Sequence, residues 1–298
     1  MNIPEPPDLY ALELVRLVAK HRGFTAASKE AGLSQSALTR QIQNVEKKLG
    51  LKVFDRTTRT LSLTEPGAVL LRETAAIPGI LKGALRRLGQ DYLAAPKQIR
   101  IGISPFLAQS HYPGLFFGKS KLGSEVRVIV RQLPEPSILS ELIEGNLDLG
   151  ILVQPPQLPS AVTAVHRMID RFCIISPIGS PMPPAEEELA TWVGEQSWLL
   201  PTAGSVSREI INKWAMEGGL SLNPGMELEN FDLMTQFVGL GMGSALVPRR
   251  CLSGLRRNDL SVRKKLSQPL DRTLIAVTPT FGIVPAHVDC FVKSILFS

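Results

Sequence analysis

The stretch Ser34–Gly50, SQSALTRQIQNVEKKLG, constrains the fold of this chain more than any other segment. Ser34 is a suitable N-cap, because its hydroxyl can accept a hydrogen bond from a free amide of the first helical turn. Gly50 supplies the left-handed residue that commonly ends a helix. At about 100° per residue, the apolar and polar side chains between them fall on opposite sides. The apolar side carries Leu38, Ile42, Val45 and Leu49, and the polar side carries Ser36, Arg40, Gln43 and Lys47.

A polar helix face is usually only a solvated surface, but this face holds hydroxyls, amides and an arginine with few acids. Such groups can donate together to base edges and phosphates. The preceding residues favour that interpretation, because Phe24–Leu33 predicts a short helix followed by a tight turn that contains glycine. A short helix, a turn and a second helix form a helix-turn-helix, whose second helix enters the major groove. An earlier amphipathic helix can be capped by Asp8.

The segment Lys52–Thr64, KVFDRTTRTLSLT, follows the second helix and predicts a β-hairpin. Apolar residues alternate on both sides of a polar tip, which is the pattern of two short paired strands. We interpret the hairpin as a wing whose Arg56 and Arg59 reach phosphate or a minor groove. A structural hairpin with incidental arginines is the alternative.

Residues 23–67 resemble the LysR-type bacterial transcription regulators, and the match runs almost without gaps. The most specific matches are LSQSALTRQI, VEKKLG, FDRTTRTLSLT and TEPG, although serine replaces the usual proline after the serine-glutamine pair. The resemblance implies double-stranded DNA as a partner. Matched to the family motif, the residues that would contact DNA are Gln35, Ser36, Thr39, Arg40, Gln43, Arg56 and Arg59.

The distribution of charge agrees with a nucleic-acid-binding head. The chain has 298 residues, enough for two or three domains. Residues 1–98 hold 15 lysines and arginines against 9 acids, whereas residues 99–298 hold 18 of each. The whole formal charge of +6 therefore belongs to the N-terminal third, as expected for a basic head on a neutral body.

Residues 65–93 predict a long linker helix with one apolar seam, which needs a partner to be buried. The resemblance implies that the helix pairs with its mate in a dimer, and packing against the chain's own body is the alternative. Pro78 and Gly79 weaken a helix interior and predict a kink or a break into two helices.

From residue 99 short apolar runs alternate with helical patterns, which is typical of an α/β fold with a buried sheet. We expect two lobes joined by two passages, at Gln154–Pro159 and near Gln268–Arg272. The first lobe would hold residues 99–154 and 272–298, and the second 160–267. The resemblance implies a two-lobed fold similar to periplasmic binding proteins (type 2). The chain is thus predicted to be multidomain, with an all-α winged helix-turn-helix domain at 1–64, the linker helix at 65–93 and an α/β effector-binding domain at 99–298.

A cleft between two such lobes would bind a small-molecule effector. Ligands of open α/β sheets sit beyond the carboxyl ends of strands, and hydroxyls at a helix N-terminus readily hold a carboxylate. The resemblance implies a small carboxylic acid, but Glu135, where the family often has serine or threonine, would repel an anion. Plain capping or turn formation is the alternative for each residue. The candidates are Ser104, Pro105, Phe106, Gln132, Glu135, Thr202, Gly204, Ser205, Phe231 and Asp232.

The chain lacks the signals of several other classes. Cys173, Cys251 and Cys290 are far apart and have no metal-ligand spacing with histidine, so we expect no metal and no cofactor. Cys173 and Cys290 lie in apolar runs and are expected to be buried. The glycines of Gly239–Gly243 are interpreted as a helix-to-strand turn. We see no signal peptide and no membrane-spanning run, which predicts a reduced cytoplasmic protein.

Three classes of function remain. The first is a regulator that binds an imperfect palindrome as a dimer or tetramer, responds to an effector and contacts RNA polymerase. The second is an enzyme of the binding-protein fold fused to a basic domain, but the chain has no G-x-S-x-G elbow, HExxH or phosphate loop and offers no catalytic residues. The third is a constitutive DNA-binding protein with a vestigial cleft. We favour the first.

Overall fold

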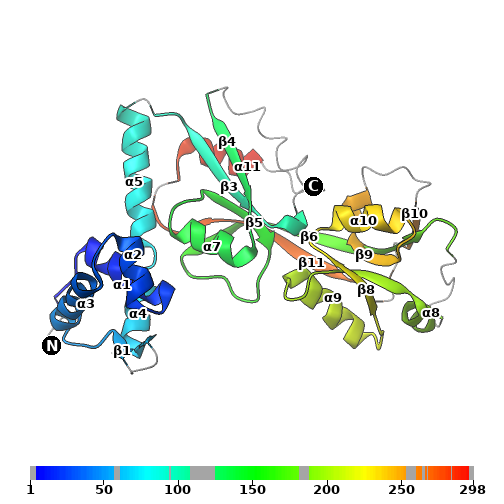
Figure 1. The fold of residues 1–298 in the computed structure, drawn as a ribbon. Helices are drawn as coiled ribbons and strands as arrows, with labels where there is room; N and C mark the ends of the chain where they lie inside the picture. The colour runs from blue at the N-terminus through cyan, green and yellow to red at the C-terminus, as the bar shows by residue number, and fades with distance from the viewer. Residues whose placement is uncertain are drawn as a thin grey trace. The chain divides into compact units, whose positions relative to one another are not determined.

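The computed structural model describes residues 5–56, 61–93, 95–107, 125–180, 188–252, 260–263, 266, 268–282 and 284–294 (Figure 1). The chain forms two compact units, Met1–Ile77 and Pro78–Ser298.

The first unit contains the predicted helix-turn-helix. Ser34 caps its second helix by accepting a hydrogen bond from the Ala37 amide at 3.1 Å, and Gly50 ends that helix at φ +67°. The apolar side of this helix is buried against the first helix and Phe54, which confirms the predicted amphipathic packing. The three helices are α1 (Leu9–His21), α2 (Phe24–Ala31) and α3 (Gln35–Leu49).

The predicted hairpin follows as strands β1 (Phe54–Arg56) and β2 (Leu61–Leu63), which pair antiparallel. Arg56 belongs to β1, but its side chain lies outside the described part of the structure, as does the whole of Arg59. Helix α4 (Glu65–Glu73) comes next and is capped by Thr64. A Cβ at Gly67 would stand 2.2 Å from the Val53 carbonyl oxygen, so glycine permits α4 to approach the base of the wing.

The predicted linker region is divided into two helices. Helix α4 ends at Glu73, and α5 (Ile77–Tyr92) begins after three turn residues. The break therefore precedes Pro78, which lies in the first turn of α5, where proline is tolerated. Four large apolar side chains of α5 are 44–58% exposed. This apolar row consists of Ile80, Leu81, Leu85 and Leu88.

The second unit is built on one mixed sheet of nine strands in the described residues, in the order β4-β3-β5-β11-β6-β9-β7-β8, with β10 paired to β6 (Figure 1). Its strands are β3 (Gln98–Ile103), β4 (Arg127–Gln132), β5 (Leu149–Val153), β6 (Val162–Pro177), β7 (Ser197–Pro201), β8 (Asn223–Leu228), β9 (Ser244–Pro248), β10 (Leu260–Arg263) and β11 (Asp271–Pro279).

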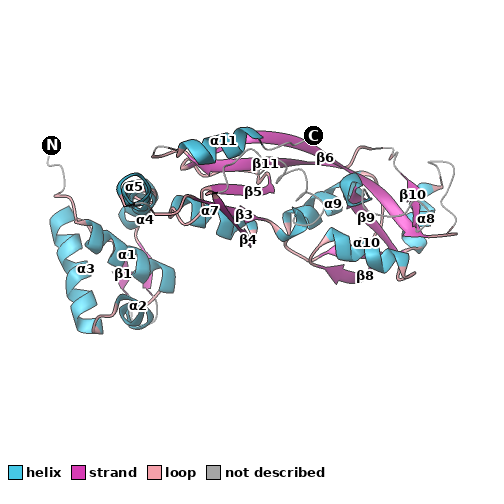
Figure 2. Ribbon diagram, turned by 90° about the horizontal axis from the view of Figure 1, so that it is seen from above, coloured by secondary structure: helices cyan, strands magenta, loops and turns pink. Residues whose placement is uncertain are grey.

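The first lobe is a three-layer arrangement around β3, β4, β5 and β11. Helix α7 (Glu135–Ile143) covers one face of the sheet and α11 (Ala286–Ser294) covers the other (Figure 2). Successive residues of a strand point to opposite faces of the sheet, so each strand contributes to the hydrophobic cores on both faces. Ile151 of β5 faces α11, whereas the next residue, Leu152, faces α7.

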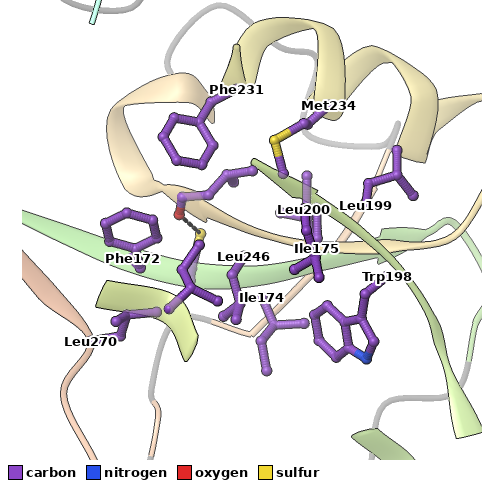
Figure 3. Close-up of a cluster of buried hydrophobic side chains, with 14 of the residues drawn as sticks. Phe172, Ile174, Ile175, Trp198, Leu199, Leu200, Phe231, Met234, Leu246 and Leu270 are labelled. Atoms are coloured by element: carbon purple, nitrogen blue, oxygen red, sulfur yellow. Dashed lines mark hydrogen bonds between the residues drawn. The ribbon is translucent and has the colours of Figure 1, made fainter. Parts of the chain in front are cut away.

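The second lobe encloses the largest hydrophobic core, part of which is drawn in Figure 3. Trp198, Phe172 and Phe231 are its largest fully buried side chains. Helix α10 (Phe231–Gly239) is followed five residues after its last residue by the start of β9, so the predicted helix-to-strand turn of glycines is confirmed. The helices of this lobe are α8 (Leu189–Glu195), α9 (Val206–Glu217) and α10 (Phe231–Gly239).

The first passage between the lobes lies further along the chain than Gln154–Pro159. Val162 and Met168, which follow that segment, still pack in the cores of the first lobe. Strand β6 pairs with β11 as far as Arg171 and with β9 from Phe172 onward. A single long strand can therefore serve both lobes, and the passage falls within it. The return passage enters β11 at Asp271.

Cys173 and Cys251 are buried, but Cys290 is exposed, so the expectation for Cys290 was wrong. The reason is helical geometry, because α11 turns Val288 and Phe291 inward and Cys290 away from the core. Among the described residues, the helices are all too short or too polar to cross a membrane.

Candidate functional site

The polar face of α3 is available for an external partner. Gln35, Ser36, Arg40 and Gln43 are exposed, and Thr39 is partly exposed. Within the described part of the chain, Arg40 and Gln43 have no hydrogen-bond or ionic partner, whereas Ser36 contacts the Ser34 hydroxyl at 3.1 Å. The free amides of the α3 N-terminus carry partial positive charge. This face therefore offers hydrogen-bond donors that suit the phosphates and base edges of a nucleic acid.

Glu46 fixes the wing to α3. Its buried carboxylate accepts hydrogen bonds from the amides of Val53 at 3.0 Å and Phe54 at 3.3 Å, and from the Lys52 ammonium at 3.2 Å. Burial raises the pKa of the Glu46 carboxyl, but these donors together outweigh burial and leave the pKa below its usual value. Sequence reasoning missed this residue, although a carboxylate four positions after the buried Ile42 was the available signal.

In the second unit, the Arg272 guanidinium contacts the loop after β3 and the first turn of α9, two of the regions that were expected to line the cleft. Its guanidinium pairs with Asp170 at 2.8 Å, donates to the Ser207 hydroxyl at 2.9 Å and approaches the Phe106 carbonyl at 3.4 Å. The side chains of Arg272 and Asp170 are 0% and 1% exposed. The loop after β3 and the first turn of α9 thus meet at one buried cation.

Aromatic rings surround this cation. The Arg272 guanidinium carbon lies 5.4 Å from the centre of the Phe172 ring and 5.0 Å from that of Phe231, which is cation–π distance. The two rings lie near each other in Figure 3, with centroids 5.6 Å apart. Phe106 adds a third ring, 5.4 Å from Phe231, and joins the core of the second lobe although its loop follows a strand of the first.

Glu135 is bound by another of the candidate residues, Ser104. The hydroxyl of Ser104, which is fully buried, donates to a Glu135 carboxylate oxygen at 2.7 Å. Glu135 stands in the first turn of α7, where the helix dipole favours a carboxylate. Pro105 and Phe106 form a short 3-10 turn beside this pair, and Gln132 ends β4 with an exposed side chain.

Polar groups of the loop before α9 also find hydrogen-bond partners within the chain. Ser205 caps α9 by accepting from the Arg208 amide at 3.2 Å, and donates to the Thr202 carbonyl at 2.8 Å. The carboxylate of Glu227 accepts from the Ala203 amide at 3.2 Å and from the Arg208 guanidinium at 2.9 Å. The Ala203 amide and then Arg208 hold the pKa of Glu227 below its usual value. The Glu227 carboxylate therefore binds the Ala203 amide and the Arg208 guanidinium, two groups that could otherwise bind an anionic ligand.

The remaining candidates have structural roles in part. Gly204 adopts φ +78°, which glycine accommodates in this turn. Phe231 is buried beside Arg272, and Asp232 lies in the first turn of α10. Asn230, rather than Asp232, caps that helix, because its side chain accepts from the Leu233 amide at 2.7 Å.

Comparison with known proteins places both units. A model described as the bacterial regulatory helix-turn-helix protein of the lysR family matches residues 9–68, and one described as the LysR substrate binding domain matches residues 95–296. The transcriptional regulator YfeR of Shigella flexneri is 23% identical over 271 residues, which span 90% of this chain and 87% of that protein.

Two solved structures share the fold. A variant of full-length OxyR from Pseudomonas aeruginosa has a TM-score of 0.61 at 17% identity, covering 97% of this chain and 95% of that one. Full-length CbnR in complex with its target DNA has a TM-score of 0.57 at 16% identity, covering 97% and 99%. The chain belongs to the LysR family of transcription regulators. It is accordingly a DNA-binding regulator with an effector-binding domain, and members of this family are not enzymes.

Replacing Glu46 with Gln is expected to destabilise the first unit by roughly 1–3 kcal/mol at pH 7, because two amides and a lysine lose a charged acceptor. Because the folded-state pKa of Glu46 lies below the unfolded-state pKa, the carboxylate stabilises the fold fully at pH values above the unfolded-state pKa. This stabilisation is lost as pH falls through the folded-state pKa. Urea unfolding of the full chain at neutral and acid pH measures both effects. Glu13→Gln, whose parent carboxylate is 49% exposed, is the control. Equal effects of the two substitutions would contradict the role of Glu46.

Replacing Arg272 with Met is expected to lower the free energy of unfolding of the second unit by roughly 3–5 kcal/mol, because Asp170 is left as a buried charge without its cation. Adding Asp170→Leu to this variant is expected to restore part of the loss, since an apolar pair of similar volume avoids burying a charge. Chemical denaturation in a double-mutant cycle measures the coupling. A double variant that is no more stable than Arg272→Met would show that the ion pair is not the source of the loss.

Proposed function

We propose that the chain is a sequence-specific regulator that binds a palindromic operator as a dimer or tetramer and responds to a small molecule between its two lobes. The observation that carries this proposal is the polar face of α3, whose Arg40 and Gln43 have no partner among the described residues, on a unit with net positive charge. The proposed DNA contacts are Gln35, Ser36, Thr39, Arg40 and Gln43, with Arg56 and Arg59 from the wing.

Self-association is supported by the apolar row on α5. Four large side chains about half exposed on one helix need a covering surface, and a second copy of α5 offers the same row. A two-fold dimer then matches a two-fold operator, because protein and DNA symmetry correspond. We propose further that the regulator acts in the cytoplasm and contacts RNA polymerase.

The proposed division of labour follows the domains expected from the sequence. Residues 1–64 bind DNA, 65–93 mediate dimerisation and 99–298 bind the effector. We place the effector among the loops near Arg272. The residues proposed to contact it are Ser104, Pro105, Phe106, Gln132, Glu135, Thr202, Gly204, Ser205, Phe231 and Asp232.

The chemistry of these loops favours an effector with hydrogen-bond donors over a simple carboxylate. Ser104 already donates to Glu135, and the loop before α9 already donates to Glu227. A carboxylate ligand would have to displace an internal carboxylate at either place and would be repelled by it. An amine or another donor-rich group would instead pair with Glu135.

Arg40→Ala tests DNA recognition. If Arg40 reads a base, the variant loses about 1–3 kcal/mol of discrimination at one operator position. Competition binding against operators mutated at single positions measures this loss. Arg127→Ala removes an exposed arginine from the second unit and is the matched control. An Arg40→Ala variant that discriminates as well as this control would contradict the proposed contact, whereas a uniform loss with a shallower salt dependence would reassign it to phosphate.

Glu135→Gln tests the effector chemistry. We expect amines to raise the melting temperature of the full-length protein more than carboxylates with the same carbon skeleton, with benzylamine and benzoate as the first pair. The variant is expected to lose its preference for the amine, because Gln carries no charge. Stabilisation of the unmodified chain by benzoate and not by benzylamine would contradict the assignment.

A further inference from the structure

Phe106 is a residue of the first lobe whose side chain is built into the second. It lies in the short 3-10 turn that follows β3. Its ring packs against Phe231, with 5.4 Å between the ring centroids, and belongs to the hydrophobic core of the second lobe. The next residue, Leu107, is fully buried in the core of the first lobe. The two cores therefore receive side chains from two successive residues of one turn.

Helix α9 makes the reciprocal contact from the second lobe. Its residues Ile211 and Trp214 are buried in the core of its own lobe. Val206, in its first turn, packs against the core of the first lobe, and Ile210 packs against both cores. Each lobe thus contributes apolar side chains to the core of the other, and burial of this apolar surface favours the joined arrangement.

Arg272 adds a polar connection at the point where the chain passes between the lobes. It lies on β11 directly opposite Asp170 of β6, and β6 begins to pair with β9 two residues later. From this position its guanidinium donates to the Ser207 hydroxyl of α9 at 2.9 Å and to the Phe106 carbonyl at 3.4 Å. The polar and the apolar contacts therefore join the same two elements, the turn after β3 and α9.

These contacts leave part of the proposed effector site out of reach of solvent. Three of the residues proposed to contact the effector are buried: Ser104 is 0% exposed, Phe231 is 1% exposed and Phe106 is 7% exposed. The ring of Phe106 lies against that of Phe231, so a molecule arriving from solution cannot take its place there until the ring withdraws. Withdrawal exposes apolar surface to water, which favours the packed arrangement when no ligand is present.

We infer that Phe106 is a latch between the two lobes and that its withdrawal from the second lobe admits the effector. The ring contact, the apolar contacts of α9 and the Arg272–Ser207 hydrogen bond keep the latch closed. An effector that binds the released arrangement has an apparent affinity reduced by the fraction of molecules that remain latched. The gating of the effector rests on the proposed function, whereas the latch itself does not.

Distances between spin labels on the full-length protein test the latch. Native Cys290 on α11 is exposed and provides the label in the first lobe, while Cys173 and Cys251 are buried. Leu240→Cys provides the label in the second lobe, because Leu240 is 74% exposed and lies outside α9. Dilution with unlabelled chain limits each assembly to one labelled copy.

With both labels and no other substitution, we expect one narrow distance distribution. Phe106→Ala removes the ring and Ser207→Ala removes the hydroxyl that Arg272 binds, so each is expected to broaden or shift the distribution. Phe237→Ala is the matched control, because its ring packs on the same core from a helix of the second lobe itself. Ser207→Ala leaves the apolar contacts in place and keeps the test valid if Phe106→Ala does not fold. Distributions for both variants that match the control would overturn the latch.

The reactivity of a thiol at the buried position 104 tests the gating. Ser104→Cys is introduced in a Cys290→Ser background, and the same background without it gives the rate of the remaining thiols. We expect slow reaction with a small aromatic disulfide, and a several-fold faster reaction when Ser207→Ala is added, since the rate follows the population of the open form. Ser176→Ala, which removes a buried hydroxyl bonded only within the second lobe, is the control.

Equal thiol reaction rates with Ser207→Ala and Ser176→Ala would overturn the gating. Both measurements are made without operator and without effector. Their failure is therefore distinct from a failure of the proposed function, which is tested by DNA binding of the Arg40 variant and by the comparison of benzylamine with benzoate.

Discussion

The buried ion pair between Arg272 and Asp170 is the interaction on which the second unit depends. A buried guanidinium is tolerated only when its hydrogen bonds are made, because taking it out of water is costly. Here Asp170 supplies the charge, Ser207 and the Phe106 carbonyl accept further N–H groups, and two phenylalanine rings cover the cation. These partners come from both lobes, so one side chain connects the two lobes.

The two functional surfaces differ in how their polar groups are satisfied. On α3, the side chains of Arg40 and Gln43 lack internal partners in the described part of the chain, as suits a surface that exchanges water for DNA. At the proposed effector site, Ser104 and the loop before α9 are held by Glu135 and Glu227. An effector therefore has to compete with internal contacts, and it can shift the conformation only by its differential affinity for two arrangements of the lobes.

The parts of the fold that the sequence predicts well are set by local interactions. Asp8, Ser34 and Thr64 each cap a helix through an amide three residues away, so the signal and its partner share one short window. The polar face of α3 follows in the same way from helical periodicity. The two lobes were expected from the alternation of apolar runs and helical patterns and from the proline-rich segment, and the LysR resemblance implies the same architecture.

Long-range contacts account for what the sequence did not indicate. Arg272 and Asp170 are 102 residues apart, and Arg272 and Ser207 are 65 apart, so nothing near either residue reveals its partner. The passage between the lobes was expected at the prolines of Gln154–Pro159, because proline marks extended connections. Pairing with β11 and β9 instead makes β6 the connection, and a strand carries no local sign of which sheet it joins.

The first unit is proposed to read a specific, symmetric DNA sequence. Selection of bound fragments from random DNA by the full-length protein, at near-physiological salt, tests it most directly. We expect recovery of a two-fold-symmetric motif, because a dimer presents two copies of α3 to the major groove. Binding that is sensitive to salt but enriches no motif would contradict it, since phosphate contacts alone carry no sequence information.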